Sequence, residues 1–119
     1  MNRDADRDSA TGAGISIQED VGLAKTSHYH WMNIEVNETR VGKMRVRLER
    51  DRLVVYSIIV FPEFQGQGYA GQVVRVLKES YTQILADRVR DTAKGFWRRM
   101  GFRADGKGNY IWQRQPETL

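Results

Sequence analysis

Residues 62–71, "PEFQGQGYAG", contain three glycines in a G-x-G-x-x-G pattern: Gly66, Gly68 and Gly71. A loop of this kind turns backbone N–H groups toward one point, and a helix that begins there adds the positive end of its dipole. Glycine also leaves no Cβ in the path of a ligand that approaches the backbone. The stretch therefore predicts a phosphate-binding loop, although the same pattern is the fingerprint of dinucleotide-binding domains.

The residues before the loop predict three antiparallel strands. Residues 31–37 and 41–49 alternate apolar and polar side chains, as strands with one buried face do. Residues 53–61, "LVVYSIIVF", form a nearly continuous β-branched and aromatic run, which is typical of a central strand buried on both faces. Short polar turns separate the three segments, at residues 38–40 and 50–52.

The residues after the loop predict a crossover. Apolar residues recur at helical spacing from Ala70 to Tyr81, and residues 84–90 follow as a short strand, which must lie parallel to the central one. Residues 91–100 then predict a short helix, with Asp91 as N-cap and Gly101 just past its end. Residues 102–114 predict a last strand or hairpin.

A dinucleotide-binding domain fits this order poorly. It needs the first glycine directly after a strand and a doubly wound parallel sheet. Here residues 63–65 intervene between Pro62 and Gly66, the strands before the loop are antiparallel, and the chain of 119 residues is too short for the rest of such a domain. Asp87 and Asp91 do lie near the distance expected for a ribose-binding acid.

The whole pattern resembles the GNAT superfamily of acyl-CoA N-acyltransferases over residues 31–114. Gln65 to Ala70 match the family's loop motif Q/R-x-x-G-x-G/A, and "DTAKGFWRRMGF" is similar to its second motif at Ala93, Phe96, Gly101 and Phe102. The resemblance implies an α/β (α+β) fold in which an antiparallel meander is followed by a β-α-β crossover, with helices packed on the mixed sheet. It also implies acetyl-CoA as cosubstrate, held by Ile58, Ile59, Val60, Gln65, Gly66, Gln67, Gly68, Tyr69, Ala70, Gly71, Phe96 and Trp97.

The catalytic residues are less well defined by the resemblance. Val54 stands where some members place an acid, Arg90 aligns with the asparagine of the second motif, and Trp97 stands where many have a tyrosine that protonates the leaving thiolate. Because the acceptor amine must lose a proton, another group or a water chain has to take it. The candidates are Tyr56, Ser57, Glu35, His30 and His28. Arg75, Lys78, Arg98 and Arg99 are candidates for phosphate contacts, and solvated helix faces explain each of them equally well.

Composition sets further expectations. The chain has no cysteine, which excludes thiolate zinc sites and cysteine nucleophiles, and we expect no metal. It has no apolar run long enough to span a membrane and no secretory signal, so a cytoplasmic location is expected. We expect residues 1–14 to form a disordered tail and residues 15–119 a single acyl-CoA-binding domain, in which "ISIQEDV" is a short edge strand.

The sequence does not identify the acceptor of the acetyl group. The net charge is +4, and Lys43, Arg45 and Arg47 share one strand face, which is either a solvated surface or a docking surface for an anionic partner. Few residues precede the meander, so the acceptor side should be open, which favours a primary amine on a protein as acceptor. The alternatives are an enzyme of the same fold that acts on nucleic acid or a small amine, and a catalytically silent module that binds coenzyme A or another protein. The sequence also leaves a homodimer open.

Overall fold

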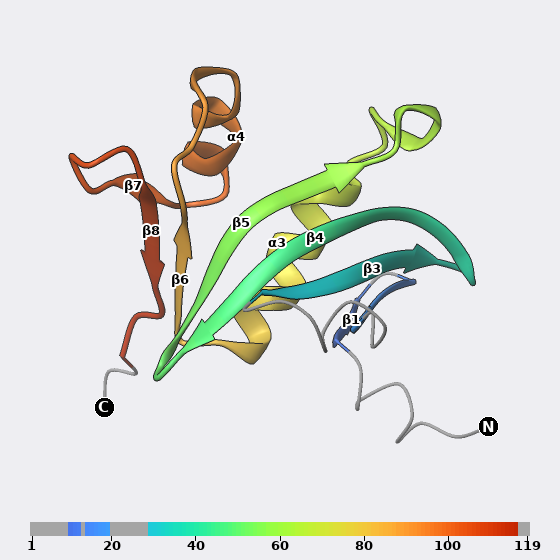
Figure 1. Cartoon of the computed structure of the whole chain (residues 1–119), viewed down its shortest axis with the longest axis horizontal. Coiled ribbons are helices and arrows are strands. Elements are labelled where there is room, and N and C mark those ends of the chain that lie inside the picture. Colours follow the sequence, from blue (N-terminus) through green and yellow to red (C-terminus); the bar gives the residue numbers. More distant parts are fainter. Residues whose placement is uncertain (1–9, 13, 20–28, 117–119) are drawn as a thin grey trace.

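The computed structural model describes residues 10–12, 14–19 and 29–116, which form one mixed eight-stranded sheet with two α-helices (Figure 1). The sheet order is β1-β2-β3-β4-β5-β6-β8-β7. The strands are β1 (Ala10–Gly12), β2 (Ile15–Glu19), β3 (His30–Val36), β4 (Thr39–Glu49), β5 (Arg52–Val60), β6 (Gln83–Ala86), β7 (Arg103–Ala104) and β8 (Tyr110–Gln113). The helices are α3 (Tyr69–Ser80) and α4 (Lys94–Arg99), with 3₁₀ turns η1 (Pro62–Phe64) and η2 (Asp91–Ala93).

The predicted meander and crossover are confirmed. β3, β4 and β5 pair antiparallel in sequence order, and β5 then pairs parallel with β6 across α3. The first turn is shorter than expected: Asn37 and Glu38 take φ values of +50° and +69°, and β4 already begins at Thr39. A two-residue turn with two positive φ angles matches the twist of the strands it joins.

The N-terminal segment differs from the sequence-based expectation in two ways. Residues 10–12 were expected in a disordered tail but form β1, which pairs antiparallel with β2. β2 is therefore not an edge strand, because β1 lies on one side of it and β3 on the other. The side chains of this segment are small and polar and do not predict a strand, so the strand depends on backbone pairing with β2. The expected tail at residues 1–9 and 13 lies outside the described residues.

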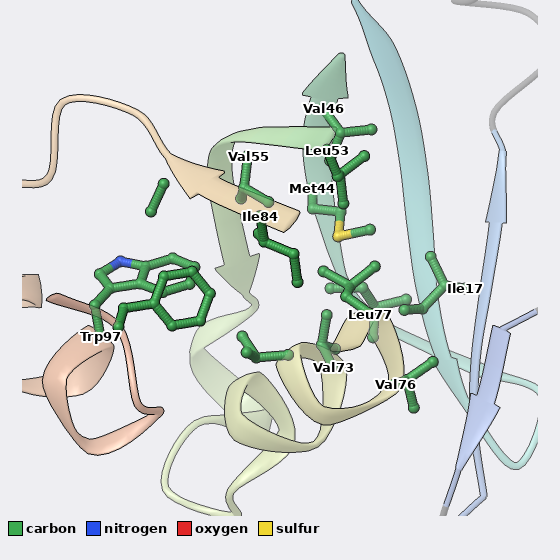
Figure 2. Close-up of a cluster of buried hydrophobic side chains, with 14 of the residues drawn as sticks. Ile17, Met44, Val46, Leu53, Val55, Val73, Val76, Leu77, Ile84 and Trp97 are labelled. Carbon is green, nitrogen blue, oxygen red and sulfur yellow. The ribbon is translucent and has the colours of Figure 1, made fainter. Parts of the chain in front are cut away.

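The main core lies between α3 and one face of the sheet. Val73, Val76 and Leu77 of α3 point at the strands in Figure 2, against Met44 of β4 and Leu53 of β5. The apolar spacing of α3 puts one stripe of the helix against the sheet, as predicted. Since successive side chains of a strand point to opposite faces, Lys43, Arg45 and Arg47 lie on the other face, which we call the outer face.

The region of α4 confirms the predicted end of the helix and corrects its start. Gly101 follows the helix with φ +87°, a conformation that favours glycine. Asp91 makes no side-chain cap; it begins η2 instead, and its Oδ1 pairs with Lys94 Nζ at 2.7 Å. No helix in the described ranges is both long and apolar enough to cross a membrane.

Two glycines provide a matched test of this packing. A Cβ on Gly42 of β4 would lie 2.2 Å from the carbonyl oxygen of Ile59, whereas one on Gly71 of α3 would meet Met100 Sδ at 3.6 Å, an ordinary contact. We expect Gly42→Ala to lower the free energy of unfolding by about 1–3 kcal/mol through overpacking. Gly71→Ala should raise it by up to about 1 kcal/mol, because alanine favours the helix. Urea denaturation measures both, and a Gly42→Ala variant as stable as the parent would contradict the close approach of β4 and β5.

Candidate active site

The glycine-rich loop connects the end of β5 to the start of α3. Gly66 and Gly68 have φ values of +82° and +80°, and Gly68 is the N-cap residue of α3. A Cβ at either glycine would meet no atom within 4 Å. Glycine is therefore required by the backbone conformation rather than by crowding, and the space above the loop is free for a ligand.

The loop presents unpaired backbone donors at the positive end of a twelve-residue helix. The first intrahelical bond runs from the N–H of Gln72 to the carbonyl of Gly68, at 3.1 Å. Within the described residues, no hydrogen bond acceptor is recorded for the amides of residues 66–71. Donors of this kind, together with the helix dipole, have the chemistry that an anionic group such as a pyrophosphate requires.

Gln65 ties this loop to the strand before it. Its side-chain Nε2 donates to the carbonyl oxygen of Val60 at 2.9 Å. The side chain therefore fixes the angle at which the chain leaves β5, and it also lines the cleft described below. This contact gives the glutamine of the motif a positioning role that spacing alone does not reveal.

β5 and β6 separate halfway along their length. They pair only between Leu53–Val55 and Ile84–Ala86, and the last bond joins the N–H of Asp87 to the carbonyl of Val55 at 2.9 Å. Beyond this point β5 bends away toward the loop while the chain after β6 turns toward α4 (Figure 1). A gap therefore opens between two parallel strands in the middle of the sheet.

The backbone of β5 faces this gap at alternate residues. The N–H of Phe61 is bonded to Val41 of β4, and the carbonyl of Val60 faces away from β4, toward Gln65. By the alternation of a strand, Ile58 exposes its N–H and carbonyl on the same side as Val60, whereas Ile59 turns its backbone toward β4. Two of the three β5 residues expected to hold the ligand thus present backbone groups to the gap.

A cleft of about 750 Å³ occupies the gap and joins the loop to the middle of the sheet. Its walls come from β5, the loop, the chain after β6, and the η2–α4 segment. The lining residues are 55–59, Gln65, Ala70, residues 86–90, Thr92, Ala93, Phe96 and Trp97. The cleft thus reaches from Gln65 and Ala70 at the loop to the side of Tyr56, Asp87 and Trp97, which we call its inner end.

Tyr56 lies at the inner end of the cleft, on a β-bulge. Arg45 pairs with Ser57 and Val46 with Val55, so Tyr56 is the extra residue of β5 at this point. Burial raises the pKa of the Tyr56 hydroxyl above its ordinary value, and the carboxylate of Asp87 contributes in the same direction. The phenol is therefore protonated at neutral pH, which suits a proton donor rather than the proton acceptor considered from the sequence.

The other predicted catalytic residues divide into two groups. Ser57 lines the cleft beside Tyr56, whereas Glu35 and His30 do not. His30 Nδ1 instead lies 2.5 Å from Glu19 Oε2, between β3 and β2. His28 lies outside the described residues.

Trp97 occupies the inner wall as a packing residue. It is 7% exposed, with its ring centroid 5.1 Å from that of Phe96 and 4.8 Å from that of Phe102. Its indole N–H does not ionise in the pH range of proteins, so it supplies no proton to a leaving group. Val54, at the position of the missing acid, is buried.

Three charged residues of the cleft were not predicted as part of the site: Asp87, Arg88 and Arg90. Asp87 follows directly on β6, and its Oδ2 lies 3.3 Å from Arg88 Nε. All three were expected inside a strand at residues 84–90, but β6 ends at Ala86, and the chain that follows it lines the cleft. Of the expected phosphate contacts, Lys78 is instead used at the other end of α3, where it donates to the carbonyl of Met100.

A structured turn between β7 and β8 supports this wall of the cleft. Asp105 accepts hydrogen bonds from the N–H of Lys107 at 2.7 Å and from the N–H and Nδ2 of Asn109. Asn109 Oδ1 in turn accepts from the N–H of Arg88 at 2.9 Å, and the carbonyl of Gly108 accepts from Val89. The turn therefore holds residues 88 and 89 in place.

Removal of the Asp105 carboxylate should loosen this turn. Hydrogen bonds from Asn109 and Lys107 hold the pKa of Asp105 below its ordinary value, so its stabilising contribution is complete above the unfolded-state pKa and is lost as the pH falls through the folded-state pKa. We expect Asp105→Ala to lower the melting temperature at pH 7, and this difference from the parent should shrink below about pH 4.

Asp91→Ala is the matched control, because that carboxylate is 92% exposed and, within the described residues, pairs with Lys94 alone. Thermal unfolding at pH 7 and at low pH should show the larger change for Asp105→Ala. Equal changes for the two variants would show that the turn does not stabilise the cleft wall.

Comparison with solved structures gives the same fold. The chain is similar to RimL, a ribosomal L7/L12 alpha-N-protein acetyltransferase in complex with coenzyme A (TM-score 0.63, 17% identity, 80% of this chain and 67% of that one). It is also similar to a GNAT family acetyltransferase from Elizabethkingia anophelis with acetyl-CoA bound (TM-score 0.61, 13% identity, 86% of this chain and 99% of that one). A third similar structure is that of Tetrahymena GCN5 (TM-score 0.61, 18% identity, 82% of this chain and 76% of that one). No curated protein matches the sequence significantly.

The family itself is shown by a sequence match. Residues 27–104 match the model of the acetyltransferase (GNAT) domain. This range contains the meander, the glycine-rich loop, α3, β6 and α4. The chain therefore belongs to the GNAT family of acyl-CoA-dependent acetyltransferases, whose cosubstrate is acetyl-CoA.

Proposed function

We propose that this protein transfers the acetyl group of acetyl-CoA directly to a primary amine on a protein. The observation that carries the proposal is the cleft between β5 and β6, which runs from an anion-binding loop to a protonated tyrosine. Acetyl-CoA supplies a thioester, whose acyl carbon is open to attack by an amine.

The cleft supports a consistent assignment of the binding residues. The amides of residues 66–71 bind the pyrophosphate at the start of α3, with Arg88 and Arg90 as further positive charges on the cleft wall. Ile58 and Val60 present backbone groups along the gap to the pantetheine arm. Phe96 and Trp97 form the apolar wall opposite.

The two titratable groups at the inner end suit the two proton transfers of the reaction. The nitrogen of the acceptor attacks the thioester carbonyl, an N–C bond forms, and the C–S bond breaks. Asp87 takes the proton of the amine through a water molecule, and Tyr56 donates its hydroxyl proton to the departing thiolate. A proton that returns from Asp87 to Tyr56 restores both groups, and the products are an acetamide and coenzyme A.

A protein acceptor is favoured by the positive charge of the outer face. Lys43, Arg45 and Arg47 lie on that face, and Arg45 contacts the ring of the cleft residue Tyr56. RimL, a protein of similar fold, acts on a protein amine, which supports the same class of acceptor here.

Release of coenzyme A provides the test. The full-length protein is incubated with acetyl-CoA and, separately, with peptides that carry free amines, with a polyamine and with DNA. Turnover that depends on peptide supports the proposal. Turnover with the polyamine alone, or with DNA alone, would show that the acceptor is a small amine or a nucleic acid rather than a protein. Binding of acetyl-CoA without turnover would identify a silent binding module.

A further inference from the structure

The outer face contains a charged side chain that the reaction itself does not use. The guanidinium carbon of Arg45 lies 5.0 Å from the ring centroid of Tyr29, 5.5 Å from that of Tyr56 and 5.7 Å from that of Trp31. We call Arg45 and these three rings the arginine cage. The rings come from the start of β3 and from the β-bulge of β5, on either side of Arg45 in β4.

Within the described residues, Arg45 has no acceptor for its hydrogen bonds. Its Nε is buried and has no partner, and no carboxylate forms an ion pair with it in the part of the chain that the structure describes. A buried donor without an acceptor is costly, and a guanidinium carries five donors in a planar fork. The rings hold that fork in one orientation, so little side-chain entropy remains to be lost when an acceptor binds.

The neighbouring cations differ from Arg45. Arg47 already pairs with Glu49, at 2.6 Å, and Lys43 lies over the outer ring of the cage, with its Nζ 5.2 Å from the centroid of Trp31. Arg45 therefore differs from both in the described part of the chain, because three rings fix its guanidinium and its buried Nε lacks an acceptor. This arrangement suits a single planar carboxylate, which an arginine fork binds through two parallel hydrogen bonds. A nucleic acid backbone would instead need several free cations.

The cage is directly connected to the active site through Tyr56. The same ring forms one wall of the cage and lines the inner end of the cleft. A carboxylate at Arg45 and an amine in the cleft would therefore lie on two sides of one aromatic ring. The two groups would then be separated by little more than the width of that ring. Since consecutive Cα atoms are about 3.8 Å apart, a peptide covers such a separation with residues that are neighbours, or nearly so.

We propose that the arginine cage selects the acceptor: a peptide amine with an aspartate or glutamate side chain one or two residues away. The proposal rests on the proposed function for the identity of the amine as acceptor. It adds a recognition site that acts on binding of the acceptor, separate from the loop that binds acetyl-CoA.

The test compares matched peptides that have a single free amine and differ at one adjacent residue, which is Glu, Gln or Arg. Two readouts are taken: the KM in turnover, and the Kd for the protein saturated with coenzyme A. We expect the Glu peptide to bind about tenfold more tightly than the Gln peptide, as a charge-assisted hydrogen bond does, and the Arg peptide to bind most weakly. Free glutamate and a DNA oligonucleotide serve as competitors.

Three variants identify the cage as the source of the preference. Arg45→Met keeps an apolar stem between the rings and should remove the difference between the Glu and Gln peptides, with acetyl-CoA affinity within twofold of the parent. Arg45→Lys keeps the charge without the fork and should retain only part of the difference. Arg103→Met removes a charge from exposed β7 and should change neither the difference between the Glu and Gln peptides nor the affinity for acetyl-CoA. If Arg45→Met does not fold, as judged by its melting curve, the comparison of Arg45→Lys with the parent still tests whether the preference for the Glu peptide depends on the guanidinium.

The outcomes separate this inference from the proposed function. Equal affinity of the parent for the Glu and Gln peptides overturns the inference, as does a preference that survives in Arg45→Met. Stronger competition by DNA or by free glutamate than by the Glu peptide also overturns it. A Glu preference in binding without any turnover would leave the cage established and the proposed activity wrong.

Discussion

Tyr56→Phe should lower kcat by about 100-fold while the affinity for acetyl-CoA stays within twofold of the parent. The size follows from the loss of a positioned proton donor, which contributes about 10²–10⁴-fold in enzymes. The ring remains, so the cleft wall and the contact with Arg45 are preserved. Steady-state kinetics and a binding titration with acetyl-CoA measure the two quantities separately.

The pH profile gives a second readout for Tyr56. Because burial raises the pKa of its hydroxyl, the proton is present throughout the neutral range and is lost only at high pH. The parent should therefore show no alkaline loss of kcat below about pH 10. Tyr81→Phe is the matched control, since Tyr81 lies at the C-terminal end of α3 and lines no part of the cleft. A Tyr56→Phe variant with at least half the parent kcat would rule out this tyrosine as the acid.

Gly68→Val should weaken acetyl-CoA binding at least tenfold, or about 1.4 kcal/mol. Gly68 has φ +80°, which a β-branched residue does not adopt without strain. The chain must then rearrange at the N-cap of α3, and the amides of residues 66–71 no longer converge. The fold itself should survive, because Gly68 is exposed and outside the core.

Gly71→Ala is the control for the loop. It leaves the amide in place and its Cβ meets only an ordinary contact, so the affinity for acetyl-CoA should stay within twofold of the parent. Isothermal titration calorimetry compares the three proteins. Should Gly68→Val bind acetyl-CoA as tightly as the parent, the loop would not be the pyrophosphate site.

The sequence predicted the parts of the fold that depend on local patterns. Alternation gave the strands around Met44, β-branched residues gave the central strand, and the glycines gave the loop and the start of α3. These features are decided by backbone conformation and side-chain periodicity within a short window. The strand at residues 10–12 was missed, because pairing with β2 depends on a partner rather than on its own residues.

The candidate site was predictable only in part for the same reason. Residues 65–71 carry their chemistry in a contiguous motif, whereas Asp87 and Tyr56 meet only because β5 and β6 are parallel and then separate. The bulge that places Tyr56 beside Arg45 is a property of the register between β4 and β5. His30 and Glu35 were chosen for their chemistry, and their places in the sheet keep both out of the cleft.

A crystal structure of the protein with acetyl-CoA would show directly whether the cosubstrate occupies this cleft. We expect the pyrophosphate on the amides of residues 66–71, the pantetheine arm along Ile58 in the gap between β5 and β6, and the thioester beside Tyr56. A pyrophosphate bound elsewhere, or an acyl group directed away from Tyr56 and Asp87, would contradict this expectation.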